Sequence, residues 1–208
     1  MSARSNEAIR LGAFQRRRRL ALFVLLCAGF ASLAFVAPAW GPAGATAVKL
    51  VGAALVWLGI LGRMWCTLYI GGRKSSEIVA DGPYSMTRNP LYVFSAVAAL
   101  GAGALSGSLL IAAGFGVATA AAFHVVILRE EGFLRDRFGE VYEAYCARVP
   151  RFFPDIRLFR DTETVTALPV RLYRTLGDGL FFFATWPAFM LIAELQDQGA
   201  IPVLLRLY

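Results

Sequence analysis

Apolar residues gather in long runs along the chain, and charged residues lie between these runs. A helix needs about 20 mostly apolar residues to cross a bilayer. Four runs fit or nearly fit this length: 20–40, 47–70, 108–128 and the shorter 179–195. A fifth run, 91–105, is rich in alanine and glycine; it is expected to span with little tilt or to form an arm packed inside the protein. The pattern predicts an all-α integral membrane protein with about five transmembrane helices.

The composition agrees with this class. Of the 208 residues, 58% are apolar and 17% are charged, too few polar residues for an ordinary water-soluble domain. Cys27, Cys66 and Cys146 lie in different segments without metal-ligand spacing, so we expect small buried hydrophobic residues and no metal site.

The net charge is +7, and the positive residues are concentrated in segments between the apolar runs. Four consecutive arginines, residues 16–19, directly precede the first run, and nine arginines lie between residues 128 and 179, before the last run. The positive-inside rule therefore places the N-terminus in the cytoplasm, most simply at a bacterial inner membrane. Because the charges do not share one amphipathic face, no nucleic-acid partner is expected. The expected divisions are a basic N-terminus (1–19), two transmembrane helices (20–70), a core carrying the chemistry (71–160), and a linker with a last helix (161–208).

The first polar segment surrounds the start of the 91–105 run. Gly82 and Pro83 signal a turn, and Asn89 before Pro90 is typical of a helix N-terminus, with asparagine as N-cap and proline at the first helical position. A helix N-terminus beside Arg88 is suited to an anion. The alternative is that Asn89 only caps the helix and that Arg88 only contributes to the cytoplasmic positive charge.

The second polar segment continues the fourth run out of the membrane. Glu131, Leu134, Phe138, Tyr142 and Tyr145 are spaced 3, 4, 4 and 3, which predicts one aromatic helix face with a carboxylate at its membrane end. Two prolines then bracket an aromatic pair in residues 149–154, which are expected to cover a pocket mouth or to form a turn anchored among headgroups.

Together these motifs resemble the isoprenylcysteine carboxyl methyltransferase family and the related phospholipid N-methyltransferases. The resemblance rests on Gly82-Pro83-Tyr84, Arg88-Asn89-Pro90, Tyr92, Glu130-Glu131, Leu134, Phe138-Gly139, Tyr142, Tyr145 and Val149-Pro150. It implies a helical membrane methyltransferase that encloses S-adenosyl-L-methionine near the cytoplasmic interface.

Carried over by motif, the resemblance implies specific site residues. The cofactor-binding candidates are Ser76, Glu77, Ile78, Val79, Tyr84, Asn89, Pro90, Leu91, Tyr92 and Glu130. The candidate catalytic residues are Arg88, Arg129 and Glu131. One departure bears on the acceptor: prenylcysteine enzymes carry an arginine one turn before the glutamate pair, and this chain has Val126 there.

The expected acceptor is a lipophilic molecule from the bilayer, similar to an isoprenylcysteine carboxylate, with a phospholipid or a small thiol as alternatives. A membrane reductase that uses NADPH and a non-catalytic membrane adaptor are alternatives of other classes. Arg63 and His124 are intramembrane ionisable residues, and each has either a site role or a structural one. The oligomeric state stays open.

Overall fold

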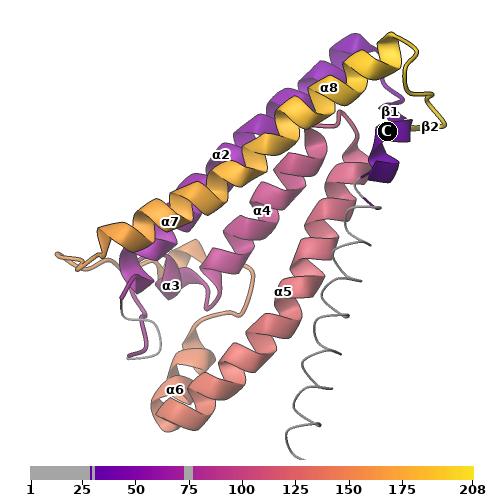
Figure 1. The fold of residues 1–208 in the computed structure, drawn as a ribbon. Coiled ribbons are helices and arrows are strands. Elements are labelled where there is room, and N and C mark those ends of the chain that lie inside the picture. Colours follow the sequence, from indigo (N-terminus) through magenta and orange to yellow (C-terminus); the bar gives the residue numbers. More distant parts are fainter. Residues whose placement is uncertain (1–28, 30, 73–76) are drawn as a thin grey trace, which may run out of the picture. The chain divides into compact units, whose positions relative to one another are not determined.

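The computed structural model describes residues 29, 31–72 and 77–208 (Figure 1). In chain order its elements are η1 (Leu33–Phe35), β1 (Val36–Pro38), α2 (Pro42–Ile70), α3 (Pro83–Met86), α4 (Pro90–Ala104), α5 (Leu109–Phe138), α6 (Glu140–Arg148), η2 (Ile156–Leu158), α7 (Pro169–Leu180), η3 (Phe181–Ala184), α8 (Thr185–Asp197) and β2 (Leu205–Leu207). The protein is mostly helical, as predicted.

Three helical stretches among the described residues are long and apolar enough to cross a membrane: Pro42–Ile70, Leu109–Phe138 and Pro169–Asp197. The fourth apolar helix, Pro90–Ala104, is shorter. The all-α membrane class is therefore confirmed, whereas the expected number of five transmembrane helices is not.

The predicted first helix lies mostly outside the described residues. Within them it does not reach Trp40, because Leu33–Phe35 is a 3-10 turn and Val36–Pro38 is a short strand paired with β2. The last apolar run begins earlier than predicted, at Pro169, because a proline at the first helical position starts α7 there.

The chain divides into two compact units, one of residues 1–37 with 192–206 and one of residues 38–191 with 207–208. In the first unit, the Gln196 side-chain amide donates to the carbonyl oxygens of Ala34 at 2.8 Å and Val36 at 3.2 Å. The second unit contains every residue discussed below.

In the second unit, α4 packs between α2 and α5 (Figure 1). Small residues bring the backbones of α2 and α4 together: a Cβ added to Gly101 would lie 2.7 Å from the Gly52 carbonyl oxygen, and one added to Gly59 would lie 2.5 Å from the Ala98 Cβ. Close approach through small residues is the usual way to pack helices in lipid, where the hydrophobic effect does not drive association.

Polar side chains also join α2 to its neighbours. Arg63 of α2 donates to the hydroxyl of Ser95 in α4, and the Thr67 and Thr175 hydroxyls lie 3.0 Å apart between α2 and α7. Arg63 therefore has a structural partner. Interhelical hydrogen bonds of this kind stabilise packing in lipid by roughly 1 kcal/mol.

The apolar run 108–128 forms the first part of α5, which has Ser108 as its N-cap and continues to Phe138. The Ser108 hydroxyl accepts a hydrogen bond from the Ile111 backbone N–H at 3.3 Å. The helix ends at Gly139, whose φ of +50° is a left-handed value that favours glycine. The prediction of a single helix face from Glu131 to Tyr145 is therefore wrong, because α6 starts in a new direction after Gly139.

Candidate functional site

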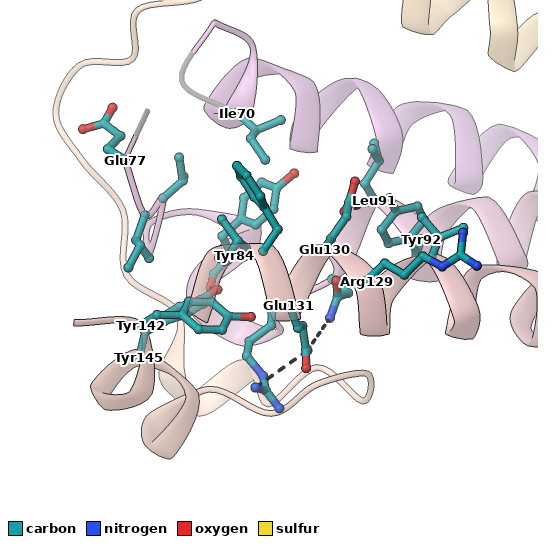
Figure 2. A pocket seen from close by; sticks show the side chains of 17 residues that line it. Ile70, Glu77, Tyr84, Leu91, Tyr92, Arg129, Glu130, Glu131, Tyr142 and Tyr145 are labelled. Atoms are coloured by element: carbon teal, nitrogen blue, oxygen red, sulfur yellow. Dashed lines mark hydrogen bonds and ion pairs between the residues drawn. The ribbon is translucent and has the colours of Figure 1, made fainter. Parts of the chain in front are cut away.

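The charged end of α5 meets α4, α6 and the end of α2 at a cavity of about 330 Å³. This volume lies within the range of small-molecule sites. Figure 2 shows the side chains around it. The lining residues are Ile70, Glu77, Ile78, Val79, Tyr84, Arg88, Asn89, Leu91, Tyr92, Val126, Arg129, Glu130, Glu131, Phe133, Leu134, Tyr142 and Tyr145.

Glu131 is buried, with 3% of its surface exposed, and it is surrounded by donors. Its carboxylate lies 2.8 Å from an Arg151 guanidinium nitrogen and 3.7 Å from one of Arg88, and it accepts a hydrogen bond from the Asn89 amide at 3.3 Å. A buried carboxylate needs such compensation to stay charged. Glu131 is thus the centre of an ion network that holds α5 to the start of α4.

Glu130 points elsewhere, because adjacent positions of an α-helix are about 100° apart. Figure 2 shows Glu130 and Glu131 leaving α5 in different directions. The Tyr92 hydroxyl, from the first turn of α4, donates to the Glu130 carboxylate at 2.9 Å. This bond orients a partly buried carboxylate that lines the cavity.

Tyr84 reaches the cavity from α3. Its side chain is 5% exposed, and its hydroxyl has no hydrogen-bond partner within the part of the chain that the structure describes. Burial raises the pKa of Tyr84 well above its ordinary value, so the phenol stays protonated and is a hydrogen-bond donor. The Tyr145 hydroxyl donates to the Tyr84 carbonyl oxygen at 2.8 Å and fixes the turn from the α6 side.

The start of α4 follows the sequence prediction in its backbone and differs in its side chain. Pro90 is the first helical residue and Asn89 is the N-cap, but the Asn89 side chain makes no cap hydrogen bond. Its amide nitrogen donates to Glu131 and, at 3.2 Å, to the Arg151 carbonyl oxygen. A cap would use the side-chain oxygen as an acceptor, whereas here the amide nitrogen orients the side chain by donating to a buried carboxylate.

Residues 149–161, here called the strap, run along the turn that carries α3. The Arg88 backbone N–H donates to the Pro150 carbonyl oxygen at 2.9 Å, and the Thr87 hydroxyl donates to that of Arg151 at 3.1 Å. Strap residues 149–154 do not line the cavity. The expectation that they cover its mouth is therefore wrong. They form hydrogen bonds with the turn at Thr87 and Arg88, and they include Arg151, which pairs with Glu131.

Most of the predicted site residues meet at the cavity. All three candidate catalytic residues line it, as do the cofactor candidates Glu77, Ile78, Val79, Tyr84, Asn89, Leu91, Tyr92 and Glu130. Pro90 is buried in the first turn of α4 and does not line it. Ser76 lies outside the described residues. Arg129 is exposed where it lines the cavity, in contrast to the paired Arg88.

His124 has a structural contact and lies outside the cavity. Its side chain is exposed, lies outside the cavity lining and faces the Phe152 ring, with 5.7 Å between ring centroids. Val126, two residues on, does line the cavity, so the wall where prenylcysteine enzymes have an arginine is apolar in this chain.

Sequence reasoning did not find the role of Arg151, nor the cavity positions of Ile70, Tyr142 and Tyr145. The two tyrosines carried a signal, because they shared an aromatic pattern with Glu131. Arg151 carried none that separates it from neighbouring arginines, since its partner lies twenty positions away on another element.

Chemically, the cavity combines an apolar wall, an oriented carboxylate and a buried phenol that has no hydrogen-bond partner in the described part of the chain. A carboxylate binds an ammonium group, and a protonated phenol donates to an adenine or ribose acceptor. These groups fit S-adenosyl-L-methionine. Among the described residues, no group of three or more histidine, cysteine, aspartate or glutamate side chains is placed to hold a metal ion.

Comparison with known proteins defines the class first. The family model described as phospholipid methyltransferase matches residues 47–141. These residues include most of α2 and all of α4 and α5, the helices that surround the cavity. The match confirms the resemblance inferred from the motifs and indicates a membrane methyltransferase.

Two curated relatives extend this result. The chain is 37% identical over 174 residues to the cobalt-zinc-cadmium resistance protein CzcN of Cupriavidus metallidurans, which covers 83% of this chain and 80% of CzcN. It is 41% identical over 136 residues to the nickel-cobalt-cadmium resistance protein NccN of Alcaligenes xylosoxydans xylosoxydans, covering 65% of this chain and 63% of NccN. The chain belongs to the same family as CzcN, and nearly half of it matches the phospholipid methyltransferase model. No solved structure matched it.

Proposed function

We propose that this protein is an integral-membrane methyltransferase that uses S-adenosyl-L-methionine and acts on a lipophilic acceptor at the cytoplasmic face. The observation that carries the proposal is the presence, in one cavity, of an oriented carboxylate at Glu130 and of the buried Tyr84 hydroxyl, which has no hydrogen-bond partner among the described residues. When bound, the cofactor supplies an activated methyl group on a sulfonium.

The residues of the chain then have separate tasks. Glu130 holds the ammonium group of the cofactor and Tyr84 donates a hydrogen bond to it. Arg88 and the N-terminus of α4 provide positive potential for its carboxylate. Methyl transfer is an in-line displacement, so positioning and exclusion of water are the main requirements, and a catalytic triad is not needed.

The acceptor is proposed to enter from the bilayer through the α5 side of the cavity. Two apolar lining residues there, Val126 and Phe133, are 40% and 51% exposed. An isoprenylcysteine-like carboxylate is the proposed acceptor, with Arg129 at the cavity as its charge partner. A phospholipid amine or a small thiol would need no such partner, so Arg129→Gln separates these acceptors: it lowers activity on the carboxylate alone.

Isothermal titration with S-adenosylhomocysteine, on protein in lipid nanodiscs, tests the cofactor site. Glu130→Gln removes a charge-assisted hydrogen bond, which contributes roughly 1.5–3 kcal/mol, so we expect affinity to fall about tenfold or more. Glu140→Gln makes the same change of charge on the exposed surface of α6 and should bind like the wild type. Equal affinity in all three proteins would remove Glu130 from the site.

Absence of S-adenosylhomocysteine binding to folded wild-type protein would overturn the methyltransferase proposal. Titration with NADPH under the same conditions then distinguishes the two alternatives. Binding of NADPH would favour a membrane reductase. Binding of neither ligand would favour a membrane adaptor.

The names of the two relatives connect them with resistance to heavy metals, and we propose that this chain serves such resistance through methylation of a membrane component. A strain that lacks the gene should become more sensitive to cobalt and cadmium. The wild-type gene should restore growth and Glu130→Gln should not. Full restoration by Glu130→Gln, with cofactor binding lost, would separate resistance from methyl transfer.

A further inference from the structure

The side of the strap away from the cavity has a shallow groove of its own. Three arginines line it: Arg88, Arg148 and Arg157. Asp155 is the acidic residue in its lining, and the Asp155 carboxylate already accepts a hydrogen bond from the Arg157 backbone N–H at 3.0 Å. The groove therefore has an excess of positive charge, which is complementary to an anion.

Apolar side chains stand beside these arginines without cover in this unit. Phe153, in the groove lining, is 88% exposed, and Ile156 is 79% exposed. Large apolar side chains next to arginines are typical of protein surfaces that meet the headgroup region of a bilayer. Such a surface binds lipids with an anionic headgroup most strongly.

The position of the strap along α5 also favours a lipid partner. Phe152 packs against His124 of α5, with ring centroids 5.7 Å apart. His124 lies seven positions before Glu131, or about two helical turns toward the apolar part of the span Leu109–Phe138. The strap thus reaches back from the charged end of α5 to the level of the membrane-spanning segment.

We propose that this groove binds the headgroup of an anionic phospholipid, with the phosphate against Arg148 and Arg157 and the acyl chains along Phe153 and Ile156. This lipid is not the methyl acceptor, because the groove is separate from the cavity that Glu130 and Tyr84 line. Arg88 lines both, so the bound lipid supports the strap and the Glu131 network from outside. The proposal does not depend on the nature of the methyl acceptor.

Native mass spectrometry of the full-length protein, titrated with phosphatidylglycerol, tests the site. We expect wild-type protein to retain one phosphatidylglycerol in preference to phosphatidylcholine. The double variant Arg148→Ala/Arg157→Ala should retain it at least tenfold more weakly. The double variant Arg135→Ala/Arg137→Ala removes the same charge from the last turn of α5, outside the groove lining, and should behave like the wild type.

Equal loss in both double variants, or equal retention of the two lipids by the wild type, would overturn the proposal. Folding of each variant is checked by S-adenosylhomocysteine binding, and a groove variant that binds it normally but loses the lipid supports a separate site.

A fluorescent reporter tests the depth of the strap independently. Phe153→Trp should give emission that brominated phosphatidylglycerol quenches, relative to wild-type protein in the same nanodiscs. Val141→Trp, on the exposed face of α6, is the matched reporter outside the groove and should not be quenched. An unquenched Trp at position 153 would show that the strap does not reach lipid and would overturn the proposal.

Discussion

The two sides of α4 differ in how they meet their neighbours. Toward α2, glycine and alanine bring the backbones so close that a methyl group on Gly101 would lie 2.7 Å from the nearest backbone atoms. Toward α5, the first turn of α4 faces a cavity lined by carboxylates, guanidinium groups and phenols. Further along α4, a Cβ added to Gly103 would lie 2.8 Å from the Ala112 Cα of α5, so close packing on both sides fixes the helix and only its first turn is free to carry chemistry on the α5 side.

A substitution on the packed side should have the largest effect. Gly101→Val places a branched side chain against the Gly52 carbonyl oxygen and the Val56 backbone nitrogen, and the backbone has little freedom to yield. We expect a loss of about 3 kcal/mol of stability, as for severe overpacking. The measurement is thermal unfolding in detergent.

Gly114→Val is the control, because a Cβ at this position in α5 meets nothing within 4 Å. Equal destabilisation by both variants would mean that helix propensity, and not the contact between α2 and α4, sets the effect.

A substitution in the ion network should have an intermediate effect. Glu131→Gln leaves the Arg88 guanidinium without its counter-charge in a site where the Arg88 side chain is 12% exposed. We expect a loss of about 2 kcal/mol in stability, the scale of a hydrogen bond to a charged group, together with weaker S-adenosylhomocysteine binding.

The matched substitution is Glu143→Gln, which removes an exposed carboxylate paired with Arg135. Surface pairs of this kind contribute little, so no measurable change in unfolding is expected. The role given to the network would be contradicted by a Glu131→Gln variant that unfolds like the Glu143→Gln variant.

The smallest effect on folding should come from Tyr84→Phe. The lost hydroxyl has no partner among the described residues, so its removal should leave stability unchanged or slightly higher. Affinity for S-adenosylhomocysteine should fall about fivefold, or about 1 kcal/mol, measured by titration calorimetry.

Tyr145→Phe is the useful companion, because that hydroxyl holds the Tyr84 carbonyl oxygen and its loss should lower stability. If Tyr84→Phe unfolds earlier and binds normally, the hydroxyl has a structural partner and no ligand.

The sequence alone was sufficient for the parts of the fold that depend on local signals. Hydrophobic runs predicted the apolar helices, and Asn89 before Pro90 predicted where α4 begins. The break after Phe138 was missed, because the spacing of apolar residues continued unchanged through Gly139. A glycine inside a periodic pattern does not reveal its φ, and here φ is positive.

In the candidate site, family motifs predicted which residues line the cavity but not how they pair. The expected cap hydrogen bond of the Asn89 side chain and the expected cover over the pocket both failed for one reason: Glu131 is buried and collects donors from distant segments. The arginine that forms an ion pair with buried Glu131 is determined by the path of the strap in the folded protein. The sequence around Arg151 contains no local pattern that predicts this path.

The composition of the ion network also has a consequence for synthesis. When Glu131 leaves the ribosome, Arg88 and Asn89 are already made, whereas Arg151 is still twenty residues behind. The carboxylate therefore enters the assembling bundle with part of its compensation and acquires the rest when the strap arrives. The order of translation places completion of this network after synthesis of the strap, which precedes α7 in the chain.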